Sequence, residues 1–267
     1  MNKQRLIEQL HQLGVTMGDT LMVHSSLKAL GDPTISPTDV IESLISTVGP
    51  AGTLLMPALS YRQTPELVHN TLLTPTNVGI IPESFRKMTG VVRSIHPTHS
   101  VCGIGKAADF YLSQHHLDNS PCGENSPFRK ILFNPTKILM LGCGLRPNTA
   151  MHAIEEILAP PYLFGDMKTY QTTPVGGASY FKEYKTHGFN AHGWLQRYDR
   201  ITDLNVAGMV TVGQTLKATS YLIDSQMLRI NAVNAIKANP FYFVEAEKAQ
   251  QDDPIDRTTF TKNPCGR

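Results

Sequence analysis

The stretch ILMLGCGLRPNTAMHAIEE, residues 138–156, gives the clearest indication of the fold in this chain. It begins with a short apolar run, which predicts a buried strand that ends in a glycine turn. A helical pattern follows and stops before Pro160 and Pro161, since proline cannot continue a helix. A buried strand that leads through such a turn into a helix is typical of α/β proteins, which place their sites at this kind of junction. We therefore expect a functional site near residues 138–156.

Similar signals lie on both sides of this stretch. Ser36 is a candidate N-cap, and Pro37 and Gly49 mark the first position and the stop of a helix between two apolar runs. This arrangement predicts a βαβ unit with a parallel pair of strands. The other expected elements are a first helix over 6–13, strands over 19–26, 52–59 and 216–225, a hairpin arm over 176–186 and a helix over 227–239. The alternation of strands and helices predicts an α/β protein around a mixed sheet.

The composition excludes several classes of protein. With 267 residues, of which 41% are hydrophobic and 17% charged, the chain can form one domain, which we place at 1–245, with a peripheral polar tail at 246–267. Its net charge is +2, and no run of clustered Lys and Arg indicates nucleic-acid binding. No apolar run reaches the roughly 20 residues that span a bilayer. Four cysteines without a CxxC pair and an amphipathic start predict a cytoplasmic protein with reduced thiols.

His152, Glu155 and Glu156 share one face of the expected helix, because they lie at positions i, i+3 and i+4. Met151 and Ile154 belong to the apolar stripe that faces the core. A carboxylate beside a histidine fixes its tautomer and can hold it as a general base near neutral pH. The spacing alone is equally compatible with solvated acids at a helix start and a surface histidine.

Polar residues elsewhere could also bind a ligand. The segment HSS at 24–26 ends the first strand and could bind phosphates or amides, or it could simply form a turn or cap. The segment VRSIHPTHS at 92–100 contains Arg93, Ser94, His96 and His99, a combination that suits an anionic cofactor. Its two histidines lack a third ligand at zinc spacing, so we expect no metal.

Cys143, in the sequence GCG, is a conceivable nucleophile because His152 lies on the helix that follows. Such a cysteine is more often a small buried residue. Gly103 and Gly105 form a lone Gly-x-Gly before a helix, which is a weak signal for phosphate binding.

Taken together, these segments resemble the aminoglycoside N3-acetyltransferase family. The resemblance runs from about residue 5 to residue 235 and rests on MVHSSLKALG, VGPAGTLLMPALSY, RSIHPTHSVCGIGKAAD, CGENSPFRKI, ILMLGCG and NTAMHAIEE in this order. Its most specific element is the Thr-x-x-His-x-x-Glu pattern of Thr149, His152 and Glu155. The resemblance implies a three-layer α/β/α sandwich around a mixed, largely parallel sheet. It also implies an acetyl-CoA-dependent enzyme that acetylates an amine of an aminoglycoside or related aminosugar.

The resemblance also implies roles for single residues. His152 would be the general base, Glu155 its partner and Asp199 the third member of the catalytic group. The CoA site would contain Ser25, Ser26, Arg93, Ser94 and His96. Acetyl would pass directly to a small-molecule acceptor in a ternary complex, without an acyl-enzyme, and the expected assembly is a monomer or homodimer.

The acceptor region departs from what a polycation requires. An enzyme that binds a polycationic aminoglycoside should present an acid-rich cleft, but the segments KTYQTTP, FKEYKTHG and LQRYDR within 160–200 hold as many bases as acids or more. A different amine or hydroxyl acceptor is therefore the first alternative. A hydrolase that uses Cys143 and His152, and a non-catalytic CoA-binding protein, are the alternatives from other classes.

Overall fold

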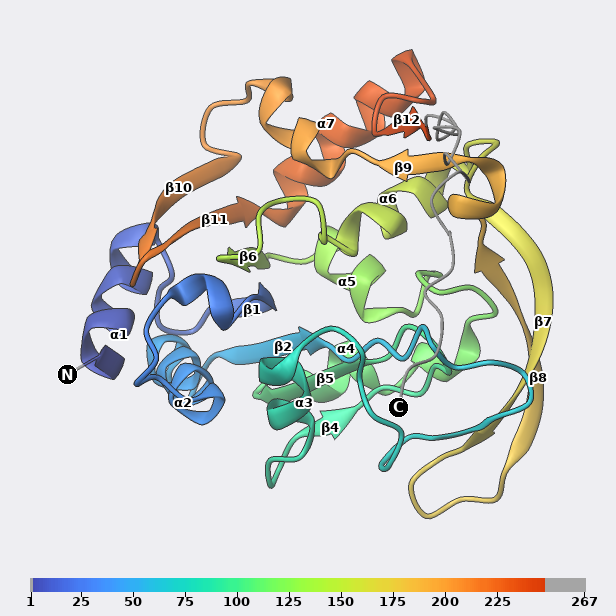
Figure 1. The fold of residues 1–267 in the computed structure, drawn as a ribbon, viewed down its shortest axis with the longest axis horizontal. Helices are drawn as coiled ribbons and strands as arrows, with labels where there is room; N and C mark the ends of the chain where they lie inside the picture. The colour runs from blue at the N-terminus through green and yellow to red at the C-terminus, as the bar shows by residue number, and fades with distance from the viewer. Residues whose placement is uncertain (1, 248–267) are drawn as a thin grey trace, which may run out of the picture.

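Seven strands form the central sheet of the computed structural model, which describes residues 2–247 (Figure 1). Their order is β10-β11-β6-β1-β2-β5-β4. The bounds are β1 Thr20–Ser25, β2 Thr53–Pro57, β4 Val92–Arg93, β5 Val101–Gly105, β6 Lys137–Leu141, β10 Val210–Thr215 and β11 Ala218–Asp224. β1 runs parallel to β2, as the βαβ pattern predicts, and also parallel to β6, so the carboxyl ends of these three strands meet at one edge. That edge carries the site described below.

The mixed character of the sheet is confirmed, but the expectation of a largely parallel sheet is wrong. Four of its six strand pairings are antiparallel, namely β10–β11, β11–β6, β2–β5 and β4–β5. The parallel part is limited to the three central strands β6, β1 and β2. Helices alone connect β1 to β2, whereas β3 Val68–Asn70, β4 and β5 lie between β2 and β6 in the chain. The outer strands arrive by hairpins or loops and reverse direction, and local hydrophobic patterns do not reveal this.

Helices cover both faces of the sheet, which confirms the three-layer α/β/α arrangement (Figure 1). Alternate strand residues point to opposite faces, so Leu21 and Val23 pack with one helical layer and Met22 packs with the other. The first layer contains α1 Asn2–Leu13, α2 Pro37–Val48 and α3 Ile80–Arg86. The second contains α4 Ala108–Leu112, α5 Pro127–Phe133, α6 Ala150–Leu158 and α7 Ser225–Ala238.

The start of α2 follows the sequence prediction in detail. The Ser36 hydroxyl accepts a hydrogen bond from the Asp39 amide at 3.1 Å, and the Asp39 carboxylate accepts one from the Ser36 amide at 3.0 Å. This reciprocal capping box, with Pro37 at the first helical position, fixes where the helix begins. The hairpin arm predicted over 176–186 is confirmed as well, since the strand β8 Tyr180–His187 covers most of it.

A long hairpin stands outside the central sheet, at the right in Figure 1. It consists of β7 Phe164–Thr173 and β8 Tyr180–His187, and β3 Val68–Asn70 pairs with β7 in parallel. A two-stranded sheet joins β9 Trp194–Gln196 to β12 Val244–Ala246. Short 3₁₀ helices are η1 Lys28–Leu30, η2 His115–Leu117, η3 Asn190–His192 and η4 Tyr198–Leu204.

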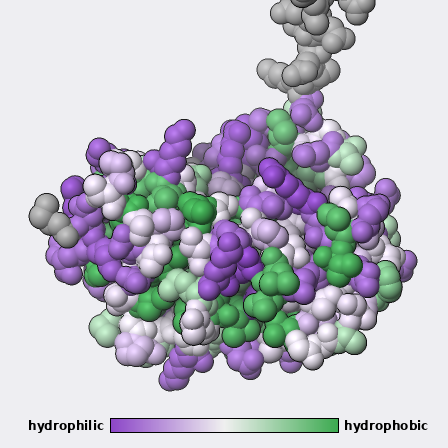
Figure 2. Space-filling view, turned by 60° about the horizontal axis from the view of Figure 1, so that its bottom comes forward, coloured by the Kyte–Doolittle hydropathy of each residue, from purple (hydrophilic) through white to green (hydrophobic). Residues whose placement is uncertain are grey.

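The surface is mixed in polarity. Figure 2 shows one face, on which hydrophobic side chains form separate patches among hydrophilic ones. Among the helices of residues 2–247, the structure contains none that is both long and apolar enough to cross a membrane. Most of the predicted tail, together with Cys265, lies outside the described residues.

Candidate active site

The turn between β6 and α6 brings His152 to the carboxyl end of the central strands. Gly142 and Gly144 both adopt positive φ, 70° and 68°, which is why glycines occupy these positions. The helix then begins at Ala150, and Met151 and Ile154 are fully buried in the core, as the helical pattern predicts. His152 lies beside this apolar stripe, with 13% of its side chain exposed.

The acidic partner of His152 is buried, so the interpretation of Glu155 as a solvated helix-start acid is wrong. Glu155 has no exposed surface. One of its oxygens accepts a hydrogen bond from the Tyr162 hydroxyl at 2.9 Å, and the other accepts one from the Tyr198 hydroxyl at 2.7 Å. Two hydroxyl donors therefore hold the carboxylate in place, and a third contact reaches the histidine.

His152 is oriented through one ring nitrogen. Its Nδ1 lies 2.8 Å from the Tyr198 hydroxyl and 3.3 Å from Oε2 of Glu155. Because these oxygens face Nδ1, the favoured tautomer carries its proton there and leaves Nε2 as the basic nitrogen. Among the described residues, Nε2 has no hydrogen-bond partner. The arrangement can accept a proton from a molecule bound beside the ring.

Asp199 does not complete this group. Its carboxylate pairs with Arg197 at 2.8 Å and with Arg146 at 3.2 Å. The hydrogen bond from Arg197 is the main reason that its pKa is lowered to about 2. Successive residues of the 3₁₀ helix η4 point in different directions, so Tyr198 faces His152 while Asp199 faces the arginines. The tyrosine takes the place predicted for the aspartate.

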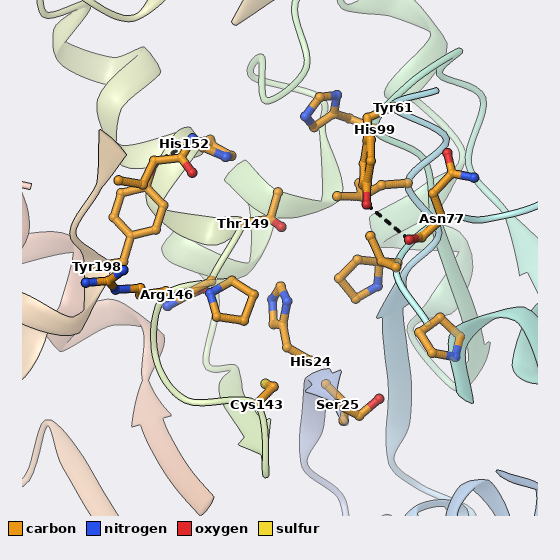
Figure 3. A pocket seen from close by; sticks show the side chains of 18 residues that line it. His24, Ser25, Tyr61, Asn77, His99, Cys143, Arg146, Thr149, His152 and Tyr198 are labelled. Carbon is orange, nitrogen blue, oxygen red and sulfur yellow. Dashed lines mark hydrogen bonds between the residues drawn. The ribbon is translucent and has the colours of Figure 1, made fainter. Parts of the chain in front are cut away.

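A first cavity of about 520 Å³ opens at the carboxyl ends of β1, β2 and β6 (Figure 3). Three buried polar atoms on residues that line it have no partner within the described structure: Nε2 of His24, Oγ of Ser25 and Nδ2 of Asn148. Unpaired buried polar groups cost free energy, and a polar ligand in this cavity can supply the missing bonds.

A second cavity of about 600 Å³ lies between His152 and the β7–β8 hairpin. It too has unpartnered buried atoms in its lining, the hydroxyl of Tyr184 and Nδ1 of His187. The two cavities share four lining residues: Tyr61, His99, His152 and Gln196. His152 therefore borders both spaces and can contact two bound molecules at once.

The neighbouring imidazoles are held neutral by burial. Burial lowers the pKa of His24 to about 3 and the pKa values of His99 and His187 well below the usual range. The ring of His187 lies 4.7 Å from that of His152, and its Nε2 lies 2.8 Å from Glu156. Glu156 is thus a second buried carboxylate, paired with a second histidine, rather than a solvated acid.

The serines predicted for the CoA site are separated by the fold. Ser25 lines the first cavity, but the Ser26 amide donates to Leu141 and its hydroxyl accepts the Ala29 amide at 3.4 Å. Ser94 is buried and bonds to His115 at 2.9 Å. Only Ser25 of the three is available to a ligand in the first cavity.

Arg93 and His96 make their contacts inside the protein, away from both cavities. The Arg93 guanidinium donates to the carbonyls of Ala58 and Thr74 and to the hydroxyl of Ser100, at 2.5–2.7 Å. His96 is 1% exposed and stacks on His115 at 4.9 Å between ring centroids. Neither residue lines the two cavities, so the structure does not bring them to the site predicted from the sequence.

Cys143 lines the first cavity, but its thiol is not activated as a nucleophile. Burial raises the pKa of its thiol to about 12, and the thiol faces the Gly144 carbonyl at 3.6 Å. A thiol protonated at neutral pH attacks poorly, which does not favour the hydrolase alternative. Over residues 2–247 the structure shows no group of three or more His, Cys, Asp or Glu that could hold a metal ion.

Sequence reasoning missed the two tyrosines that hold Glu155, and it missed Tyr61 and Gln196 among the four residues shared by the cavities. Tyr198 directly precedes the predicted Asp199, and Tyr61 opens a polar loop whose length is unusual for a simple connection. Tyr162 follows two prolines and carries no recognisable signal. Its contact with Glu155 depends on tertiary packing.

Comparisons with known proteins agree with this geometry. The family model described as aminoglycoside 3-N-acetyltransferase matches residues 22–237. Aminoglycoside N(3)-acetyltransferase IV from Salmonella sp is 32% identical over 160 residues, covering 60% of this chain and 60% of the relative. The SPbeta prophage-derived aminoglycoside N(3')-acetyltransferase-like protein YokD from Bacillus subtilis is 33% identical over 175 residues, covering 57% and 64%. The chain thus matches less than two thirds of the length of each.

Solved structures resemble the chain over more of its length. YokD from Bacillus subtilis superposes with a TM-score of 0.79 at 27% identity, covering 90% of this chain and 94% of that one. AAC-IIIb, solved as a binary complex with CoASH, superposes with a TM-score of 0.75 at 25% identity, covering 89% of this chain and 97% of that one. AAC-VIa, bound to sisomicin, superposes with a TM-score of 0.76 at 26% identity, covering 89% of this chain and 98% of that one.

Proposed function

Because the chain belongs to the aminoglycoside 3-N-acetyltransferase family, we propose that it transfers an acetyl group from acetyl-CoA to an amine of a small aminosugar-like acceptor. One observation carries the proposal: His152, held by Glu155 and Tyr198, borders two cavities at once. A direct transfer requires this geometry, since both substrates must be present when the proton moves.

The first cavity suits the donor. Its unpartnered Ser25 hydroxyl and Asn148 amide can bond to the carbonyl and amide groups that an acyl thioester and its pantetheine arm present. The structure of a relative, AAC-IIIb, was solved as a binary complex with CoASH. The proposed donor site keeps Ser25 and adds Asn148. It leaves out Ser26, Arg93, Ser94 and His96, because none of these four residues lines the first cavity.

His152 can act as the base when the acetyl group passes from acetyl-CoA to the amine. The amine nitrogen attacks the thioester carbon and a C–N bond forms, while Nε2 of His152 accepts the proton that the nitrogen loses. The negative charge that develops on the carbonyl oxygen needs a donor, and Nδ2 of Asn148 is a buried candidate. The C–S bond then breaks, and CoA leaves as its thiol after taking up a proton.

A hydroxyl acceptor is the second candidate. The second cavity contains neutral His187 with Nδ1 unpartnered, and such a nitrogen can accept a hydrogen bond from either an amine or a hydroxyl. His152 would then deprotonate an alcohol instead of an amine. Product analysis separates the two, because an ester is cleaved by mild hydroxylamine and an amide is not.

The test is release of free thiol from acetyl-CoA in the presence of amines that include sisomicin and glucosamine. We expect release that depends on the acceptor and an acetylated product of the mass of the acceptor plus one acetyl group. Thiol release without any acceptor would indicate a hydrolase. CoA binding without product from any acceptor would indicate a binding protein. The His152→Ala variant measures the spontaneous reaction.

A further inference from the structure

The second cavity has the wrong charge for a polycation. Its lining includes Lys168 and Lys185 from the hairpin and, among the described residues, no Asp or Glu. Two of its histidines, His99 and His187, have pKa values lowered by burial and so add no charge at neutral pH. The wall that faces an acceptor therefore carries positive charge, and a molecule with several ammonium groups would be repelled by it.

Lys168 lies over the cavity because of its strand register. It is opposite Tyr184 in the antiparallel pairing, and it shares the inward face of β7 with Tyr170 two residues later. Both tyrosines are buried, at 1% and 4% exposure, whereas Lys168 is exposed at the mouth. Among the described residues its ammonium group makes no ion pair within 4.0 Å, so it can bind an anion.

Nearby carboxylates do not cancel this charge. Glu155 lies behind His152 and Glu156 behind His187, and each carboxylate already accepts hydrogen bonds from protein donors. Glu66 is exposed outside the lining. Its pKa is lowered mainly by a hydrogen bond from Thr64 and only lastly by the charge of Lys168. No acidic group is left to receive an ammonium inside the cavity within the described structure.

We infer that the acceptor of this protein carries an anionic group, a phosphate or a carboxylate, which Lys168 binds while the amine lies at His152. Lys185, which also lines the cavity and whose ammonium lies 4.9 Å from the Phe164 ring, adds to the positive potential. The inference rests on the proposed acetyl transfer and narrows its substrate class. It replaces a polycationic antibiotic by a small amine with a negative charge.

The experiment compares matched acceptors. Glucosamine, glucosamine 6-phosphate and 2-amino-2-deoxyglucuronic acid share an amine and differ at one end in charge, and sisomicin serves as the polycation. We expect kcat/KM for one anionic acceptor to exceed that for glucosamine by about tenfold, the size of one charge-assisted hydrogen bond. Phosphate and carboxylate probes show which anion is preferred. Sisomicin should be the poorest acceptor.

Charge reversal identifies the residue. In Lys168→Glu the ratio of kcat/KM between the anionic and neutral acceptors should fall to about one or below. Lys237→Glu, which changes the net charge equally on exposed α7, should keep the wild-type ratio. A ratio of one in the wild type, an unchanged ratio in Lys168→Glu, or preferred acetylation of sisomicin would each overturn the inference.

A binding measurement separates this inference from the proposed function. The dissociation constant of glucosamine 6-phosphate is measured calorimetrically on protein saturated with CoA, which needs no turnover. Binding that weakens about tenfold in Lys168→Glu, together with no acetyl transfer to any acceptor, supports the anion site and overturns the acetyltransferase proposal. Acetyl transfer with equal kcat/KM for the anionic and the neutral acceptors would support the acetyltransferase proposal and overturn the anion site. Equal binding by both proteins rejects the role of Lys168.

Discussion

The Tyr198 hydroxyl lies 2.8 Å from Nδ1 of His152 and donates to Glu155 at 2.7 Å, so one phenol connects the histidine to its carboxylate. The direct contact between His152 and Glu155 is longer, at 3.3 Å. Tyr198 is therefore a positioning residue that acts through the histidine. Its role gives the most specific test of the site.

Replacing Tyr198 with Phe should lower kcat by about tenfold to a hundredfold, because His152 loses its hydrogen-bonded orientation. The KM for acetyl-CoA should change little, and the pH dependence of kcat should shift because a neighbour of the base has been removed. Steady-state rates from pH 5 to 9 measure both. Asp199→Asn is the matched control at the adjacent position, and a similar loss in that variant would restore the aspartate to the catalytic group.

Replacing His152 with Ala should remove most turnover, by about 10²- to 10⁴-fold, because general base catalysis contributes on that scale. The affinity for CoA, measured by calorimetry, should stay near that of the wild type, since several other residues line the first cavity. Turnover close to the wild-type rate would contradict the assignment of the base.

Replacing Asn148 with Ala should lower kcat by about 10²-fold if Nδ2 stabilises the developing oxyanion. The Asn148 side-chain oxygen also accepts the Ala150 amide at 3.2 Å, so part of the effect could be structural. Asn148→Ser supplies a hydroxyl that can serve as a cap and lacks the amide donor. Equal melting temperatures with equally low kcat in both variants would identify the donor, and restored kcat in the serine variant would exclude it.

Arg93→Gln should destabilise the protein by about 3 kcal/mol or more, because it leaves buried carbonyls without donors. Urea denaturation measures this loss. At a temperature where the variant is folded, its dissociation constant for CoA should equal that of the wild type. A stable variant with weakened CoA binding would instead return Arg93 to the phosphate site that the sequence suggested.

The free energy of unfolding should fall as the pH decreases below about 6.5. Burial lowers the pKa values of His24, His69 and His115 to about 3 in the folded chain, with a smaller part from neighbouring charges. The unfolded chain then binds more protons between pH 6.5 and 3, so these residues destabilise the fold increasingly in acid. Each contributes a loss of about 2 kcal/mol at pH 5 relative to pH 8, from the shift in pKa.

Denaturation curves at pH 5 and pH 8 measure this effect. The His69→Leu variant, which removes a buried imidazole whose two nitrogens have no partner in the described structure, should lose less stability in acid than the wild type. His116→Gln removes an exposed histidine and should keep the wild-type difference. An unchanged difference in His69→Leu would contradict the prediction.

Local patterns predicted the central elements, and tertiary contacts decided the rest. The strand before Gly142 and the helix that carries His152 follow from apolar periodicity and turn residues, which act over a few positions. The antiparallel outer strands depend on long-range pairing, so the sheet is less parallel than expected. An alternating pattern was enough to indicate β8, but not that β3 would pair with β7.

The candidate site shows the same contrast between what local patterns predict and what tertiary contacts decide. The shared helix face made His152 and Glu155 candidates, and the resemblance to the family then selected them as the base and its partner. Arg93 stands next to hydroxyl residues in the sequence as a phosphate-binding arginine would, yet the fold directs its guanidinium inward. Tyr198 and Asp199 are adjacent, and only the turn geometry of η4 determines which one meets the histidine.

The hairpin that forms one wall of the second cavity is not part of the seven-stranded sheet. Substitutions on its inward face, at Lys168 or its neighbours, can alter the acceptor without disturbing the folding of the sheet or the donor cavity. Selection can therefore act on acceptor choice and on stability almost independently. Relatives with similar sheets and different hairpin residues would be expected to diverge in substrate while retaining the same reaction.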